Sequence, residues 1–226
     1  MRAVIFSKDR PLQLECLLRS MKEHCNIFDT VVVLYKTSMY EAYEILKMDY
    51  PEVIFKREKN FKQDFLSLIM PGYNCLLVDD DIFFRDVLKH EVYDMLTECD
   101  IGSLRLGNNI KHKKHFHVRS SVDGNIFRGD LLKKLADDRF KNPNQLEIAL
   151  NKYCLDSTMA WFNEPRLIGV PNNRVSDSSG CAHMKGDISE LENAFLQGFR
   201  IDYKQMNLEC DNVHINEKLC LSPGQQ

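Results

Sequence analysis

The sequence lacks the features that identify several common protein classes. Its eight cysteines are scattered and never form a C-x-x-C pair, which argues against a zinc site and favours reduced thiols. It has no G-x-x-x-x-G-K-[ST] loop, which excludes P-loop kinases. The longest apolar runs, residues 30–35 and 75–78, are far too short to span a membrane as helices. No signal peptide is recognisable at the start, so we expect a cytoplasmic protein without a transmembrane segment.

Charge and size narrow the possibilities further. The 30 basic and 33 acidic residues give a formal net charge of −3, so there is no basic excess to attract nucleic acid. With 226 residues and 44% hydrophobic residues, the chain can bury one sizeable core. We expect one domain over residues 1–212, and a tail or the start of a linker over 213–226.

The hydrophobic pattern predicts an α/β fold. Strand-like segments alternate with helix-like stripes in the first half, and the fourth strand has no polar interruption, as in a sheet covered on both faces. The predicted strands are 3–7, 30–35, 53–55 and 75–78, and the predicted helices are 12–25, 38–48 and 61–69. The order βαβαβαβ favours a parallel sheet with ligands at the carboxyl ends of its strands. A mixed extension of the same domain follows, with predicted helices at 86–99, 130–135 and 145–153 and a strand at 101–106.

Three consecutive carboxylates follow the fourth predicted strand. In an extended backbone Asp79 and Asp81 would point to one side and Asp80 to the other. Adjacent buried carboxylates repel one another unless a cation or basic groups compensate them, and hard oxygen ligands favour Mn²⁺ or Mg²⁺. The alternative is an exposed acidic turn. The apolar residues on both sides of the triplet favour an interior position and a metal site.

With this placement, the segment from Leu76 to Asp81 resembles the DxD motif of GT-A glycosyltransferases. The opening from Val4 to Pro11 resembles the first strand of that family and the turn that meets the donor nucleotide. Weaker matches at 142–147, 171–175 and 191–202 are similar to compact, family-2-like glycosyltransferases of microbes and large viruses. The resemblance implies a single-domain GT-A fold, a Rossmann-like mixed sheet flanked by helices.

The resemblance also implies an activity. The chain would use Mn²⁺ or Mg²⁺ to transfer a hexose or deoxyhexose from a nucleotide-diphosphate sugar to a hydroxyl acceptor. A UDP-sugar is the favoured donor, the acceptor would be a glycan or glycoprotein, and transfer would invert the anomeric configuration.

The family's site roles carry over to particular residues. Asp81 would bind the metal directly, and Asp79 would contact the ribose or a metal-bound water. The remaining donor contacts would be Ser7, Lys8, Arg10, Thr37, Lys62, Gln63, Asp80 and Arg105. For Arg10 the alternative is a surface arginine capping the turn, and for Lys62 and Gln63 a solvated helix face. His183 is favoured over His214 as a third metal ligand, the alternative being a structural histidine.

An inverting transferase also needs a general base. Glu147 is the first candidate, placed at the third position of a helix capped by Asn144, and Asp130 is the second. The Glu-Asp pair usual in the family is absent. Glu147 could instead be a capping-box glutamate that reaches back to the helix start. Trp161 is interpreted as a core residue, or as a platform for acceptor sugars.

The basic segment 111–117 could be a solvated loop or a lid on the diphosphate, because its lysines oppose a cation.

Three other functions compete with that of a glycosyltransferase. A haloacid-dehalogenase-type phosphatase places its DxD after the first strand rather than the fourth. A sugar-nucleotidyltransferase would need a glycine-rich loop after the first strand, where Ser7 to Pro11 contains no glycine. A binding module that keeps the fold without turnover is the non-enzymatic alternative.

Overall fold

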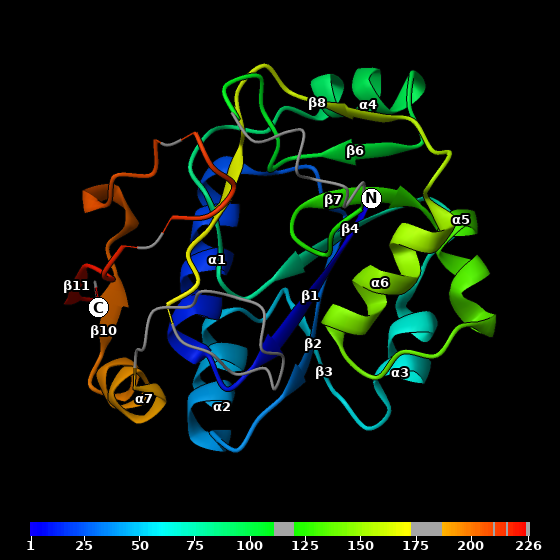
Figure 1. Ribbon diagram of the computed structural model, residues 1–226. Coiled ribbons are helices and arrows are strands. Elements are labelled where there is room, and N and C mark those ends of the chain that lie inside the picture. Colours follow the sequence, from blue (N-terminus) through cyan, green and yellow to red (C-terminus); the bar gives the residue numbers. More distant parts are fainter. Residues whose placement is uncertain (111–119, 173–186, 210, 216, 225–226) are drawn as a thin grey trace.

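The computed structural model describes residues 1–110, 120–172, 187–209, 211–215 and 217–224. A seven-stranded mixed sheet with the order β3-β2-β1-β4-β7-β6-β8 forms the centre of the molecule, with helices packed against it (Figure 1). This arrangement confirms the predicted single-domain α/β fold with a Rossmann-like mixed sheet flanked by helices.

The first half of the chain forms the parallel part of the sheet. Its strands are β1 Arg2–Lys8, β2 Thr30–Lys36, β3 Ile54–Arg57 and β4 Tyr73–Val78, and its helices are α1 Pro11–His24, α2 Tyr40–Asp49 and α3 Phe61–Leu68. All four predicted strands and all three predicted helices of this half are confirmed. Phe6 pairs with Leu34 on one side and Val78 on the other, so the carboxyl ends of β1, β2 and β4 lie together.

The second half reverses the direction of the next strand. β7 Asn125–Arg128 runs antiparallel to β4, with Asn125 opposite Leu76 and Arg128 opposite Tyr73. β6 Ile101–Ser103 is antiparallel to β7, and β8 Met159–Trp161 is parallel to β6. The start of β7 and the ends of β6 and β8 therefore join the carboxyl edge of β1 and β4.

Several predicted elements differ in extent. The helix expected at 86–99 is α4 Lys89–Thr97, and the strand expected at 101–106 ends at Ser103. The segment 130–135 lies in α5 Gly129–Lys133 and the 3-10 helix η2 Lys134–Asp137, while α6 is Pro143–Tyr153. β6 ends at Ser103 although the next residue, Leu104, is also apolar. The carbonyl of Leu104 accepts backbone hydrogen bonds from Arg166 and Leu167 (2.7 and 3.1 Å), outside the ladder of the central sheet.

Apolar side chains cover both faces of the sheet. Along β1 the alternation is strict: Ala3 and Ile5 join the core with α1 and α2, while Val4 and Phe6 join the core with α3 and α6. Burial on both faces accounts for strands without a polar interruption.

The last part of the chain packs against α1. Here α7 Ile188–Leu196 precedes β10 Phe199–Ile201, the 3-10 helix η3 Tyr203–Gln205 and β11 Leu221–Pro223, which pairs antiparallel with β10. Within the segment 213–226, expected to be a tail or the start of a linker, Val213, Ile215 and Leu219 are buried. These residues enter the core singly, so no hydrophobic period marks them.

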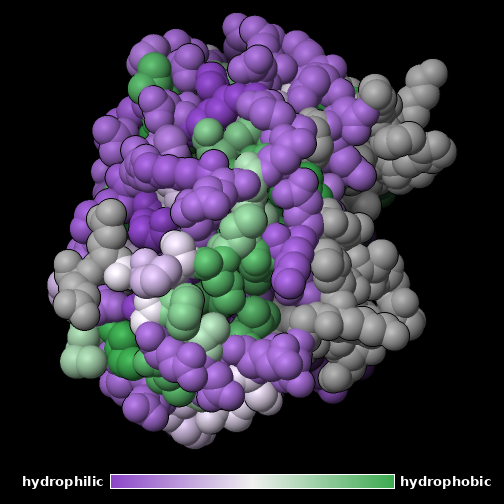
Figure 2. Space-filling view, turned by 90° about the vertical axis from the view of Figure 1, so that its left-hand side faces the viewer, coloured by the Kyte–Doolittle hydropathy of each residue, from purple (hydrophilic) through white to green (hydrophobic). Residues whose placement is uncertain are grey.

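One face carries exposed apolar side chains. Figure 2 shows an apolar strip between hydrophilic margins on the side formed by α7, β10 and β11. Leu196 and Leu221, from α7 and β11, are 37% and 40% exposed. No helix in the described ranges is both long and apolar enough to cross a membrane.

Candidate functional site

The acidic triplet lies at the carboxyl edge of the sheet, beside the end of β1. The backbone pairing between β4 and β1 extends to Asp79, whose N–H donates to Phe6 O (3.1 Å). Asp79, Asp80 and Asp81 are 3%, 9% and 0% exposed, so the triplet is buried rather than an exposed acidic turn. The chain turns at Asp79 and Asp80, and β5 Asp81–Phe83 then pairs with β9 Leu167–Gly169.

The expected alternation of the three side chains is wrong. Asp81 Oδ2 accepts a hydrogen bond from Val78 N (3.0 Å), which closes the turn and ends the extended backbone at Val78. As a result Asp79 and Asp80 both contact Arg10, while Asp81 interacts electrostatically with a different group of residues. The triplet thus serves two separate clusters.

The first cluster, here called the Arg10 cluster, contains Arg10, Asp79 and Asp80. Arg10 Nη1 donates to Asp79 Oδ1 (2.9 Å) and Asp80 Oδ2 (2.7 Å), and Lys8 N donates to Asp79 Oδ2 (3.0 Å). Arg10 is only 6% exposed, so it is not the surface arginine considered as the alternative. Burial alone would lower the pKa of Arg10, but Asp80 and Asp79 raise it above its usual value. Burial raises the pKa of Asp79 to about 6, against the opposing effect of Arg10.

Ser7 and Thr37 line the same edge without facing open solvent. Ser7 Oγ lies 2.6 Å from the hydroxyl of Tyr43, and Thr37 Oγ1 donates to Asp9 Oδ1 (3.1 Å). Both residues are buried, at 6% and 7% exposed. Their described contacts connect the loops at this edge to each other.

The second cluster, here called the Arg105 cluster, contains Asp81, Arg105, Asp123, Glu147 and His214. Arg105 Nη1 donates to Asp123 Oδ2 and lies 3.3 Å from His214 Nε2. His214 is placed here because its backbone forms a bridge to Gly169, which also pairs with Asp81.

Electrostatic interactions connect the members of the Arg105 cluster. Burial raises the pKa of Asp81 well above its usual value, and the charge of Asp123 raises it further. Burial would also raise the pKa of Asp123, but Arg105 and then His214 bring it below its usual value. The cluster therefore places three carboxyl groups beside one guanidinium and one imidazole.

Glu147 enters this cluster from the first half of α6. Its Oε1 accepts hydrogen bonds from Ser121 Oγ (2.7 Å) and Val122 N (3.1 Å). Burial, and then the charge of Asp123, raise the pKa of Glu147 above its usual value. A buried carboxylate with raised basicity suits a general base.

The cap of α6 is different from the one expected. Asn142, not Asn144, is the N-cap, and its side chain accepts from Gln145 N (2.9 Å). Gln145 reaches back to Lys141 N (2.9 Å), so the capping glutamate suggested for Glu147 is replaced by Gln145. Pro143 starts the helix two residues earlier than the sequence interpretation assumed, which moves Glu147 beyond the first turn.

Asp130, the second candidate base, lies at the opposite edge of the sheet. β7 runs antiparallel to β4, so it carries the chain from Asp123 at the carboxyl edge to Arg128 at the far edge. There Asp130 forms an exposed ion pair with Arg128 (2.8 Å). The structure therefore does not bring Asp130 to the site, because the direction of β7 separates it from Asp81.

Other predicted contacts have mixed outcomes. Lys62 Nζ donates to the backbone carbonyls of Ala136 and Asp138 (2.6 Å each), so it is neither a solvated lysine nor aimed at the triplet. Gln63 is exposed, and its backbone N–H is capped by Asn60 Oδ1 (3.1 Å). Trp161 is 37% exposed at the end of β8, so the core interpretation is wrong. His183 and the basic segment 111–117 lie outside the described residues.

Sequence reasoning missed Asp123 and undervalued His214. Asp123 stands before Gly124, whose φ of +74° marks a turn, and before a buried strand, whereas Asp79 drew attention because it follows one. The direction of that strand, which decides the edge, is not visible in sequence. His214 follows no motif and reaches the site through its bridge to Gly169.

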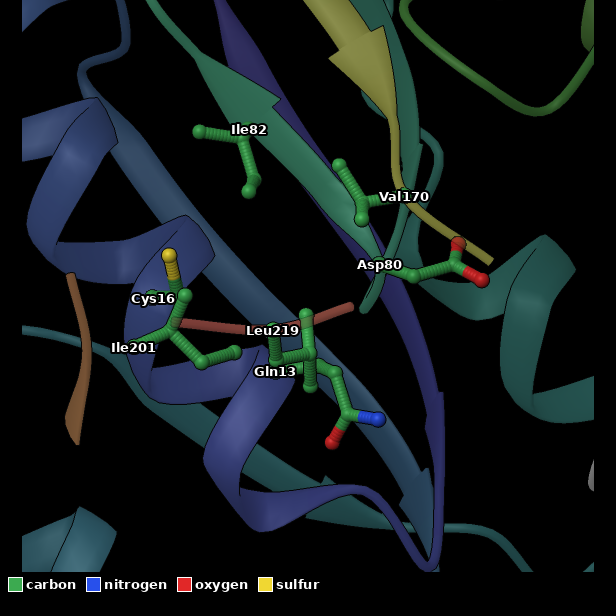
Figure 3. A pocket seen from close by; sticks show the side chains of 7 residues that line it. All are labelled: Gln13, Cys16, Asp80, Ile82, Val170, Ile201 and Leu219. Atoms are coloured by element: carbon green, nitrogen blue, oxygen red, sulfur yellow. The ribbon is translucent and has the colours of Figure 1, made fainter. Parts of the chain in front are cut away.

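The small crevice beside this edge does not hold a nucleotide. It leaves no room for a bound ligand and is lined by Gln13, Cys16, Asp80, Ile82, Val170, Ile201 and Leu219. Figure 3 shows the Asp80 carboxylate turned away from Cys16 and Ile82, so the carboxylate does not point into this apolar crevice.

The residues present fit a hard divalent cation at Asp81. Its Oδ1 is buried, and no described residue donates a hydrogen bond to it. In the described ranges no three His, Cys, Asp or Glu side chains already form a metal centre. A cation here would therefore depend on Asp81 and on ligand oxygens, as is common for Mg²⁺ with phosphate ligands.

Comparison with known proteins supports the fold. No protein-family model matches the chain, and no curated protein matches it. Among solved structures, the chain resembles S. aureus TarS 1–349 in complex with UDP (TM-score 0.57, 14% identity), covering 74% of this chain and 59% of that one. It also resembles TarS 1–349 in complex with UDP-GlcNAc (TM-score 0.52, 12% identity), covering 74% and 57%.

A longer TarS chain gives a similar result. Its TM-score is 0.55 at 12% identity, covering 74% of this chain and 36% of that one. The chain thus spans between about one third and three fifths of the length of these TarS chains. At these identities the likeness establishes a shared GT-A-like fold.

Proposed function

We propose that the chain is a metal-dependent glycosyltransferase that takes its sugar from a nucleotide-diphosphate donor, with a UDP-sugar favoured. The observation that carries the proposal is Asp81, a buried carboxylate at the carboxyl edge with an unpartnered Oδ1 among the described residues. The likeness in fold to TarS, which was solved with UDP and with UDP-GlcNAc, supports the choice of donor.

The two clusters would have different roles in the reaction. Asp81 would hold Mn²⁺ or Mg²⁺ together with the donor diphosphate, with His183 or His214 as a further ligand. A bound cation would stabilise the negative charge on the departing nucleotide diphosphate. The Arg10 cluster, with Ser7, Lys8 and Thr37, would form the wall against which the nucleotide binds.

Glu147 is proposed as the base that takes the proton from the acceptor hydroxyl. Its raised pKa makes it a stronger base than an exposed glutamate. The charges of Arg105 and Asp123 each act on both Asp81 and Glu147. Arg105 would contact the sugar or a phosphate of the donor. The acceptor would be a glycan, a glycoprotein or another hydroxyl compound, and transfer would proceed with inversion.

Calorimetric titration with UDP tests the proposal. We expect binding in Mn²⁺ that is lost in excess chelator, because diphosphate and Asp81 repel each other without a cation between them. Asp81→Asn should lose the Mn²⁺ dependence, and Asp130→Asn serves as a matched control at the far edge. Equal UDP affinity with and without chelator contradicts the metal requirement.

Turnover requires a separate measurement. Hydrolysis of UDP-sugars in Mn²⁺, followed by UDP release, distinguishes an enzyme from a binding module. UDP binding with no release from any UDP-sugar, with or without candidate acceptors, would favour the binding module.

A further inference from the structure

The turn after β1 is held in an uncommon conformation by the loop after β2. Asp9 has a φ of +51°, in the left-handed region that residues other than glycine adopt at a cost. Its Oδ1 accepts hydrogen bonds from Ser38 N (2.7 Å), Ser38 Oγ (3.1 Å) and Thr37 Oγ1 (3.1 Å). Strained backbone of this kind persists where surrounding contacts determine it, often at functional sites.

A tyrosine holds the same turn from the side of α2. Tyr43 is fully buried, and its hydroxyl lies 2.6 Å from Ser7 Oγ and accepts a long hydrogen bond from Arg10 N (3.4 Å). Its ring stacks on Tyr35, with centroids 5.0 Å apart and planes 17° apart. The ring is therefore fixed by packing, and its hydroxyl has a defined position.

The turn held in this way is the one that serves the carboxylates. Lys8 N donates to Asp79, and the Arg10 side chain donates to both Asp79 and Asp80. These donors come from residues on either side of Asp9, so a change in the path of the turn would move both of them.

We propose that Tyr43 is a positioning residue of the donor site. Its hydroxyl, together with Asp9, holds the turn from Ser7 to Arg10 so that this turn orders the carboxylates of Asp79 and Asp80. The nature of the ligand rests on the proposed function. The positioning itself is a property of the free protein.

The chain contains a matched control for this role. Tyr50 follows α2 at its other end, is 9% exposed, and donates its hydroxyl to Glu15 Oε1 (3.2 Å) in α1. Tyr43→Phe and Tyr50→Phe therefore each remove one buried hydroxyl from the same helix region while keeping the ring. Of these two hydroxyls, that of Tyr43 contacts the turn after β1, and that of Tyr50 contacts Glu15 in α1.

Two measurements on the full chain test the proposal. Hydrogen exchange of the amides in residues 6–12, measured without ligand, should speed up by about tenfold in Tyr43→Phe and stay at the wild-type rate in Tyr50→Phe, since Tyr43→Phe removes the hydroxyl that contacts Ser7 Oγ and Arg10 N. In Mn²⁺, the Kd for UDP should rise by about 3- to 10-fold in Tyr43→Phe only. The melting temperatures of the two variants should lie close together.

The outcomes separate this proposal from the function it serves. Equal exchange at residues 6–12 in both variants, or unchanged exchange in Tyr43→Phe, overturns the positioning role. Faster exchange with an unchanged Kd for UDP also overturns it as a role in the donor site. If the wild-type protein binds no UDP, the proposed function fails, while the exchange rates still decide whether Tyr43 positions the turn.

Discussion

The Arg10 and Arg105 clusters use the same acidic triplet but balance its charge differently. In the Arg10 cluster one buried guanidinium contacts both carboxylates, and a backbone N–H supplies a further donor. In the Arg105 cluster one guanidinium serves three carboxylates, and Asp81 Oδ1 has no hydrogen-bond partner among the described residues. Asp79 and Asp80 of the first cluster share a guanidinium through direct hydrogen bonds, whereas a bound cation would complete Asp81 in the second.

This difference suggests a structural role for the Arg10 cluster and a chemical role for the Arg105 cluster. A buried carboxylate without compensation is costly, so its pKa rises unless a cation or a basic group compensates the charge. The Arg10 cluster orders the turns at the edge, and the Arg105 cluster is the place where a cation and a reacting hydroxyl would be used. Four predictions test this division, beginning with the largest expected effect.

Glu147→Gln should show the strongest effect on turnover. Glutamine can still accept from Ser121 Oγ and Val122 N, so folding and UDP affinity should be retained. Loss of the base should cut turnover by roughly 10²–10⁴-fold. Steady-state transfer and UDP titration of the same preparation check both statements, and near-normal turnover would remove Glu147 from the reaction.

Arg10→Ala should chiefly reduce stability. The sequence suggested a donor contact or a surface arginine capping the turn, but Arg10 is buried with Asp79 and Asp80. Removing one partner of a buried ion pair costs about 3–5 kcal/mol, so urea unfolding should show a large loss. A variant as stable as the wild type would mean that the cluster does not need its guanidinium.

The Arg105 cluster predicts a pH dependence of stability. The folded-state pKa of Glu147 is raised above its value in the unfolded chain, so the folded protein holds this proton more tightly. The stabilisation is therefore fully present below the ordinary glutamate pKa and is lost as the pH rises through the folded-state value. Urea midpoints of wild type and Glu147→Gln should diverge over that interval, and parallel curves would argue against burial of an ionisable Glu147.

Asp130→Asn should have the smallest effect. Its exposed pairing with Arg128 at the far edge contributes little, as is usual for surface ion pairs. Melting temperature, UDP affinity and turnover should all stay within about twofold or within error of the wild type. A large loss of turnover would transfer the role of base to Asp130 and refute the separation of the two edges.

The parts of the site that could be predicted follow one local rule. Thr37, Asp79 and Asp80 follow the ends of apolar strands, Ser7 lies near the end of β1, and parallel strands bring such positions together. Glu147 was found through resemblance, although its cap was misplaced. Asp123 and His214 come from segments whose partners are distant in sequence, and Asp130 was misplaced because strand direction has no sequence signature.

The sequence by itself determined the parallel half of the sheet, because apolar strands and amphipathic helices alternate there with clear local periods. It also determined that three carboxylates would lie at the carboxyl edge. Only the tertiary structure decided that Arg10 compensates two of them and that Asp81 faces Arg105 and Asp123 instead. These partners meet through an antiparallel strand and a non-repetitive C-terminal segment, and pairings of that kind depend on long-range contacts that no local pattern records.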